Sequence, residues 1–137
     1  MSRIVHVVGT GTIGEPLIGL LCHFKEKLGI DEVTFNKRSP LFTDRSKVKT
    51  LLDRGAKLST SQEAMAGFEK LGLKAEFETR EAIERSAVVI DCTPSGAGLA
   101  NKSEFYESAS SVKGFIAQGS EFGFGKMYAR GINDEAL

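Results

Sequence analysis

The chain has 137 residues, enough for one domain with its own core and too few for two ordinary ones. Its 18 basic residues balance its 18 acidic ones, so no excess charge favours nucleic acid or an anionic membrane as a partner. There is no apolar run of membrane-spanning length and no signal-peptide pattern, and two cysteines make neither a disulfide framework nor a zinc site. We therefore expect a cytoplasmic domain with reduced thiols and no bound metal.

The first sixty residues alternate between strand and helix patterns. Residues 3–8, RIVHVV, are rich in β-branched side chains and are predicted to form a buried parallel strand. A helical pattern follows and ends at Gly29. Residues 31–36 are a second predicted strand, 43–54 a second helix, and 56–60 a short third strand.

The alternation continues through the next thirty residues. A helix capped by Ser61 is predicted to run through residue 71, and residues 73–78 alternate like a strand. Thr79 is predicted to cap a short helix that ends at residue 85. Residues 87–92, AVVIDC, are the most apolar predicted strand after the first.

The last part of the chain opens with a glycine-rich break, TPSGAG, at residues 93–98. A helix at 102–108 and strands at 112–118 and 127–132 are predicted to follow. Strands that alternate with helices at this spacing are typical of a parallel sheet covered on both faces, connected by right-handed crossovers. The predicted fold is therefore a single α/β domain with a Rossmann-type, doubly wound, mostly parallel sheet.

The first predicted strand leads directly into a G-x-G-x-x-G motif at a helix start. The first glycine permits the tight turn, the second lets a pyrophosphate approach the backbone, and the third lets helix pack on strand. The helix N-terminus adds free N–H groups and a partial positive charge. The motif predicts a dinucleotide site formed by Gly9, Thr10, Gly11, Thr12, Ile13 and Gly14. A glycine-rich turn with a purely structural role is the alternative.

Charged residues directly follow this motif and the second predicted strand. Glu15, in the first helical turn, stabilises the helix but repels a pyrophosphate if its carboxylate points toward it. The second predicted strand ends in Asn36, Lys37 and Arg38, where NAD-binding folds usually carry an acid for the ribose 2′-OH. Lysine and arginine attract a 2′-phosphate, which favours NADP over NAD, although NAD stays possible. Two solvated surface charges are the alternative interpretation.

Three segments together resemble the archaeal-type glyceraldehyde-3-phosphate dehydrogenases. They are GTGTIG with its preceding strand, NKRSP after the second strand, and VVIDCTPSGAGLANKSEFYE followed by FIAQGSE. The resemblance runs from about residue 4 to the last residue, and it is weakest between 41 and 75. The D-C-T-P-x-G-x-G-x-x-N-K stretch is its most specific part.

The resemblance implies roles for individual residues. Thr12 and Ile13 would contact the dinucleotide, and Lys37 would lie near the adenosine ribose or its phosphate. The approach to the nicotinamide would be lined by Thr93, Pro94, Gln118 and Gly119. The family usually has a basic residue where Glu15 stands, and often Asn where Val8 stands.

The resemblance also implies that residues 1–137 are the NAD(P)-binding domain alone. In the family, the nucleophilic cysteine lies in an S-C-N-T segment shortly after the stretch that matches residues 131–137, and a catalytic domain follows. The complete enzyme oxidises the aldehyde by cysteine attack, hydride transfer to the nicotinamide, and release of the acyl group by phosphate. The expected partners are the dinucleotide and either that catalytic domain or a second copy on the surface the domain would cover.

The residues present offer little chemistry of their own. Cys92 follows the strand that faces the predicted site but has no evident base, so we expect Cys22 and Cys92 to be small apolar side chains of the core. His6 is expected to be a strand histidine with satisfied hydrogen bonds, and Asp91 an acceptor that organises its loop. Two alternatives remain for the function: a non-catalytic dinucleotide-binding or regulatory module, and the front half of a semialdehyde or homoserine dehydrogenase.

Overall fold

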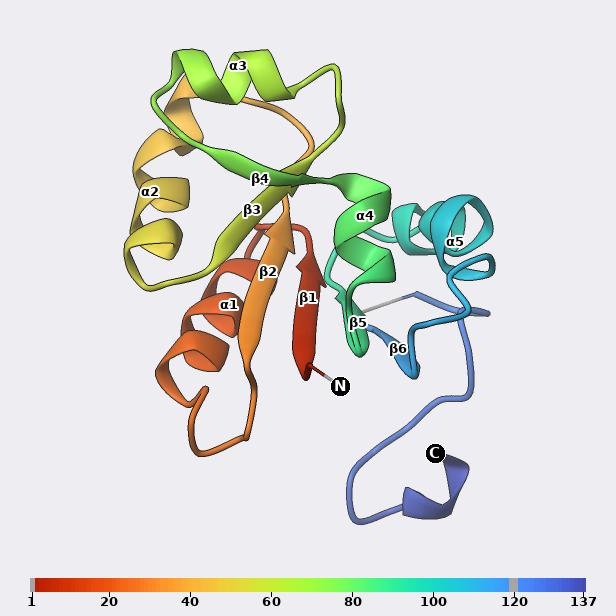
Figure 1. Ribbon diagram of the computed structural model, residues 1–137. Coiled ribbons are helices and arrows are strands. Elements are labelled where there is room, and N and C mark those ends of the chain that lie inside the picture. The colour runs from red at the N-terminus through yellow and green to blue at the C-terminus, as the bar shows by residue number, and fades with distance from the viewer. Residues whose placement is uncertain (1, 119–120) are drawn as a thin grey trace.

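A computed structural model describes residues 2–118 and 121–137, with six parallel strands forming one sheet between two layers of helices (Figure 1). The strand order is β4-β3-β2-β1-β5-β6, so the chain reverses its direction of travel across the sheet between β1 and β5. The strands are β1 (Ile4–Val8), β2 (Glu32–Asn36), β3 (Lys57–Thr60), β4 (Ala75–Glu78), β5 (Val88–Asp91) and β6 (Gly114–Ala117). The predicted Rossmann-type α/β fold is confirmed, and every strand pair is parallel.

The helices divide between the two faces of the sheet, as Figure 1 shows. One core cluster joins α1 and α2 to the sheet, with Ile18 and Val48 packed against Val7 and Phe35. The other cluster joins Val8 of β1 and Val89 of β5 to Ile83 of α4 and to Tyr106 and Ala109 further along the chain. The helices are α1 (Gly14–His23), α2 (Arg45–Asp53), α3 (Met65–Lys70), α4 (Thr79–Glu84) and α5 (Ala97–Asn101), with short 3-10 turns at Phe42–Asp44 and Asp134–Ala136.

Strand register sets where the loops of the sheet meet. Val8, the last residue of β1, is level with Asn36 on β2 and with Asp91 on β5. Asp91 is in turn level with Ala117, the last residue of β6. Four neighbouring strands therefore end on one line, and the loops that follow them share one edge of the sheet.

Several predicted element boundaries are wrong. The predicted helix at 102–108 begins earlier, because α5 starts at Ala97 and continues into a π-helical turn at Lys102–Tyr106. The helix that was expected to start after Ser61 begins only at Met65. Glu78, rather than Thr79, caps α4, since its carboxylate accepts the Arg80 N–H at 2.8 Å.

No strand forms at 127–132, in contrast to the prediction. Side chains bind the backbone groups that a strand would offer to a neighbour. The Ala129 N–H donates to the Asn133 side chain at 2.7 Å, and the Gly131 N–H donates to the Asp134 carboxylate at 2.9 Å. Such local side-chain hydrogen bonds compete with sheet ladders and favour turns.

Candidate functional site

The carboxyl edge of the sheet brings most of the predicted site residues together. The loops after β1, β2, β5 and β6 carry residues 9–14, 36–38, 93–94 and 118. Gly119 lies outside the described residues. The reversal between β1 and β5 is the position at which open α/β sheets form their ligand crevice. These residues were predicted from separate segments, and the topology explains why they are neighbours.

The three glycines of the loop have three different environments. Gly9 has a φ of 101°, a conformation that favours glycine. At Gly14 a side chain is impossible, because its Cβ would lie 2.0 Å from the carbonyl oxygen of Gly9. At Gly11 a Cβ would meet nothing within 4 Å, and the residue is exposed. The fold thus explains the first and third glycines, while the second leaves its backbone open to an incoming group.

The end of β2 is tied into the sheet by Asn36. Its side-chain amide donates to Ser59 Oγ at 3.1 Å and to Thr79 Oγ1 at 3.0 Å. Its carbonyl accepts the N–H of Gly9 at 3.2 Å. Asn36 therefore holds the glycine loop and the second strand in register.

The two cations after Asn36 differ in their freedom. Lys37 Nζ lies 2.8 Å from Asp44, and the two side chains are only 11% and 22% exposed. The hydrogen bond from Lys37 lowers the pKa of the Asp44 carboxyl. Arg38 is exposed and makes no ion pair or side-chain hydrogen bond within the described part of the chain. Arg38 is thus the cation at this position that is available to a ligand.

A third cation, which sequence reasoning missed, reaches the glycine loop from α2. Lys47 Nζ lies 3.3 Å from the carbonyl oxygen of Thr10 and 3.8 Å from a carboxylate oxygen of Glu15. Asp44 is also 3.8 Å away. No local motif marks Lys47, because its partners lie on other elements or one helical turn back.

Asp91 organises the loop after β5. Its carboxylate accepts hydrogen bonds from the N–H and hydroxyl of Thr93, from Asn101 at 3.0 Å and from Tyr106 at 2.6 Å. Its backbone carbonyl accepts the N–H of Gln118 at 2.9 Å. The predicted role of Asp91 as a hydrogen-bond acceptor is confirmed. Burial, together with Asp91, raises the pKa of Tyr106, which stays a donor.

The segment after β6 folds back over the same loop. The carboxylate of Glu121 accepts the N–H groups of Gly96 and Gly98, each at 2.9 Å. Lys102 donates to the carbonyl of Phe124 at 2.6 Å. Pro94 is exposed at the start of this loop. The loop conformation therefore depends on residues more than twenty positions away.

Neither thiol resembles an activated nucleophile. Burial, together with the charge of Asp91, raises the pKa of Cys92 to about 11. Burial also raises the pKa of Cys22. Both cysteines pack against the larger core cluster, as predicted.

His6 is fully buried in β1, and its prediction as a satisfied histidine is only half right. Its Nδ1 lies 2.6 Å from Thr34 Oγ1, but Nε2 has no hydrogen-bond partner among the described residues. Burial lowers the pKa of His6 to about 3. The imidazole is therefore neutral near pH 7.

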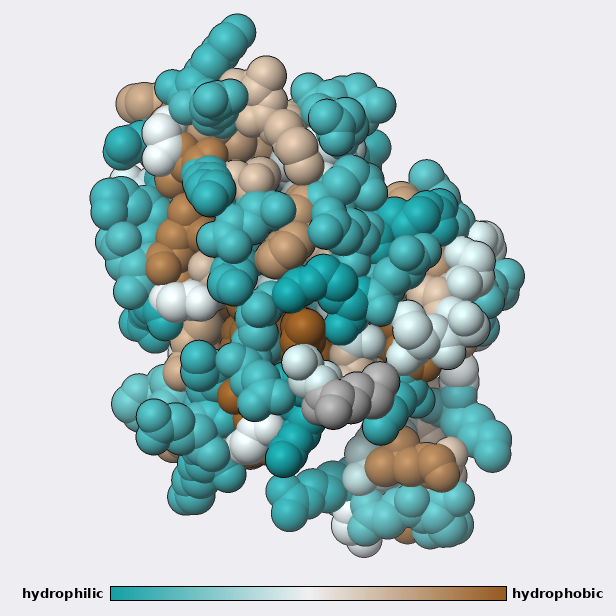
Figure 2. All heavy atoms as spheres, viewed as in Figure 1, coloured by the Kyte–Doolittle hydropathy of each residue, from teal (hydrophilic) through white to brown (hydrophobic). Residues whose placement is uncertain are grey.

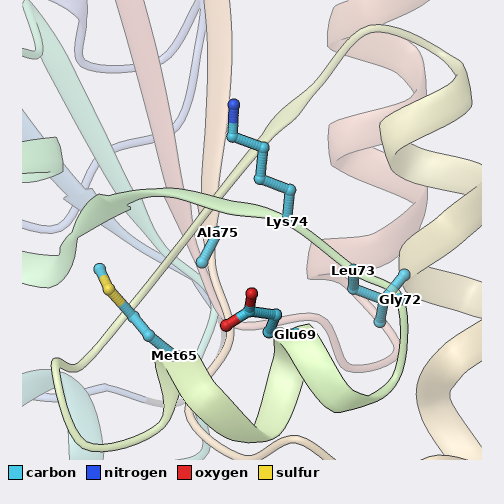
Figure 3. Close-up of a pocket in the computed structure, with 6 residues that line it drawn as sticks. All are labelled: Met65, Glu69, Gly72, Leu73, Lys74 and Ala75. Atoms are coloured by element: carbon cyan, nitrogen blue, oxygen red, sulfur yellow. The ribbon is translucent and has the colours of Figure 1, made fainter.

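Two hollows lie away from the glycine loop. One, of about 480 Å³, is formed where α3 meets the start of β4, and Figure 3 shows Met65, Glu69 and Ala75 on its walls. The other, of about 320 Å³, is lined by Cys22, His23 and Arg54. In residues 2–118 and 121–137 no cluster of three or more His, Cys, Asp or Glu could hold a metal, and no helix could cross a membrane.

Fold and site together define a Rossmann-type α/β domain with its glycine loop at the point where the sheet order reverses. No family model matches the chain. It is 33% identical over 117 residues to glyceraldehyde-3-phosphate dehydrogenase 1 of Methanosarcina acetivorans, covering 85% of this chain and 32% of that protein. The enzymes of Methanobacterium bryantii and Methanobacterium formicicum are 34% and 35% identical, each over 77% of this chain and 29% of the relative.

The chain is thus homologous to archaeal glyceraldehyde-3-phosphate dehydrogenases, which confirms the resemblance, and it spans about a third of their length.

Proposed function

We propose that the chain binds a nicotinamide dinucleotide at the carboxyl edge of its sheet. The observation that carries this proposal is Gly11, which is exposed and where a Cβ would meet nothing within 4 Å. A pyrophosphate needs such an opening beside a helix N-terminus. The chain's own residues would hold the pyrophosphate on residues 9–14 and the adenosine ribose beside 36–38. The nicotinamide would lie toward 93–94 and 118–119.

The proposal extends to the function of the homologous enzymes. Residues 1–137 act as the cofactor-binding portion of an NAD(P)-dependent, phosphorylating glyceraldehyde-3-phosphate dehydrogenase. When bound, the nicotinamide accepts a hydride from the aldehyde substrate. In this portion Asp91 fixes the loop at Thr93, and Asn36 fixes the turn at Gly9, so both sides of the proposed site are preorganised.

We further propose that the chain binds NADP more tightly than NAD and that Arg38 causes this preference. Lys37 supports this less than the sequence indicated, because Asp44 already neutralises it. A free guanidinium can bind a 2′-phosphate bidentately.

The proposed partners follow from exposed apolar side chains, and the proposed location from the free cysteines. In the C-terminal segment Met127, Ile132 and Leu137 are 78%, 81% and 82% exposed, and Figure 2 shows brown apolar surface there among mainly hydrophilic side chains. Exposed apolar patches mark contact surfaces. We propose that a second protein surface covers this segment, either a catalytic domain or a second copy. Both cysteines are free, in keeping with a reducing cytoplasmic location.

Calorimetric titration with NADP and NAD tests the binding proposal. Gly11→Val should abolish binding without changing the melting temperature, since its side chain points into open space. Gly125→Val is the matched control, because its Cβ also meets nothing within 4 Å and it lies outside the proposed site. Absence of binding by the parent chain, or unchanged binding by Gly11→Val, would contradict the proposal.

A further inference from the structure

Lys47 reaches from α2 to the backbone of the glycine loop and is only loosely held there. Its ammonium has three donors, yet one contact is a 3.3 Å approach to the Thr10 carbonyl and the two carboxylates lie 3.8 Å away, beyond hydrogen-bond distance. The side chain is 32% exposed. Lys47 can therefore donate a hydrogen bond to a further anionic oxygen without leaving its place.

Lys37 provides the contrast. Its ammonium lies 2.8 Å from Asp44, and its side chain is 11% exposed. A ligand could recruit Lys37 only by breaking this short, covered ion pair. Of the two lysines near the glycine loop, Lys47 is the one with spare donors and access to solvent.

We propose that Lys47 provides the positive charge that binds the pyrophosphate of the dinucleotide, and that Glu15 is the residue that positions Lys47. This inference rests on the proposed function. The pyrophosphate is assigned to the glycine loop, and the Lys47 ammonium lies against the Thr10 carbonyl of that loop.

Glu15 has a different role here from that of a repelling charge. It stands in the first turn of α1, and its carboxylate faces the Lys47 ammonium. The carboxylate attracts the cation toward the start of α1 without a hydrogen bond, and the cation offsets the negative charge that Glu15 brings to a phosphate site. A carboxylate near the pyrophosphate is therefore tolerated because α2 supplies its counter-charge.

Lys47 and Arg38 should differ in their effects on the binding of NAD and NADP. NAD and NADP share the pyrophosphate and differ in the 2′-phosphate. Loss of Lys47 must weaken both cofactors by the same factor, whereas loss of Arg38 must weaken NADP alone.

Three charge variants test this by calorimetric titration with NADP and with NAD at one salt concentration. Lys47→Glu should raise both dissociation constants about tenfold or more, as expected when a charged hydrogen-bonding partner is lost. Lys49→Glu is the matched control, with the same charge change on the same helix but with Asp53 as partner, and it should change them by less than about twofold. The swap Glu15→Lys/Lys47→Glu returns a cation to the loop and should restore binding to within about threefold of the parent chain. Circular dichroism melts confirm that each variant folds.

The outcomes separate the two proposals. A parent chain that binds neither cofactor overturns the proposed function and this inference with it. A parent chain that binds, with Lys47→Glu no weaker than Lys49→Glu, overturns this inference alone. Weakening confined to NADP would assign Lys47 to the 2′-phosphate, and a swap as weak as Lys47→Glu would remove Glu15 from its positioning role. Either result contradicts the inference.

Discussion

The glycine loop and the loop after β2 form two sides of the same candidate site, but different parts of the chain determine them. In the glycine loop, the backbone of six consecutive residues satisfies the requirement, and Gly14 fits only because it has no side chain. After β2, the availability of the two cations to a ligand depends on Asp44 in the following 3-10 turn. Asp44 pairs with Lys37 and leaves Arg38 unpaired among the described residues. A site made of backbone groups can be predicted from a short stretch of sequence. A site made of charged side chains cannot, because its properties depend on partners that are distant in the sequence.

In the glycine loop, the addition of a single methyl group should cause the largest loss of stability. Gly14→Ala would place Cβ 2.0 Å from the Gly9 carbonyl oxygen, so α1 must move away from β1. We expect a loss of at least about 3 kcal/mol in the free energy of unfolding, or no folded protein, because backbone cannot yield as a side chain can. Denaturant unfolding measures this, with Gly11→Ala as the control that should retain the parent stability.

The two regions should also differ in their response to acid. His6 lies in the strand that leads into the glycine loop, and its pKa is lowered from 6.5 to about 3. Between these two pH values the imidazole is protonated in the unfolded chain and neutral in the folded chain. Its contribution to stability is complete above pH 6.5 and is lost as pH falls toward 3. At pH 5 the loss is roughly 2 kcal/mol. Asp44, whose pKa is lowered from 3.8, loses its contribution only below about that pH.

His6→Gln separates these windows, because glutamine can still bond Thr34 but does not titrate. Melting temperatures measured between pH 7 and 4.5 should fall steeply for the parent chain and less for this variant. The same slope in both proteins would show that His6 is not the acid-sensitive group. Lys37→Ala should leave this range unchanged and alter the profile only below about pH 4.

The loop after β2 should show smaller effects, divided between stability and specificity. Lys37→Ala leaves the largely covered Asp44 carboxylate without its closest partner, at an expected cost of about 1 kcal/mol. Arg38→Ala should leave stability unchanged and weaken NADP about tenfold relative to NAD. Titration and unfolding of both variants check this division. A loss of NADP preference in Lys37→Ala alone would return the specificity role to Lys37.

The sequence predicted the six strands of the sheet because each is marked by local composition, as in RIVHVV and AVVIDC. It missed the long-range contacts. Lys47, Glu121 and Tyr106 meet their partners across helices and loops, and no periodicity reveals such pairs. The strand predicted at 127–132 was wrong for a related reason. Its composition resembles a strand, but Asn133 and Asp134 bind the backbone groups first.

The last prediction concerns Cys92, where we expect no effect at all. Covalent oxidation of an aldehyde needs a thiolate, a base within hydrogen-bond reach and donors for the oxyanion around one carbon. Burial and the charge of Asp91 raise the pKa of Cys92 to about 11, so it is a thiolate in about one molecule in ten thousand at pH 7. Within residues 2–118 and 121–137, His6 bonds Thr34 and His23 packs on Phe24, and no hydrogen bond joins either imidazole to a thiol.

The 137-residue polypeptide should therefore not oxidise glyceraldehyde 3-phosphate, with or without Cys92→Ala. The assay is reduced-cofactor absorbance in the presence of phosphate and NADP or NAD, with a complete glyceraldehyde-3-phosphate dehydrogenase as positive control. Cys92→Ala should also leave both dissociation constants unchanged to within about twofold, because Cys92 packs against the larger core cluster and is not within 4 Å of a Cβ placed at Gly11. Turnover by the parent chain that Cys92→Ala abolishes would make Cys92 a nucleophile despite its raised pKa. It would also place catalysis on the β5 side of the site, opposite the charged loop after β2.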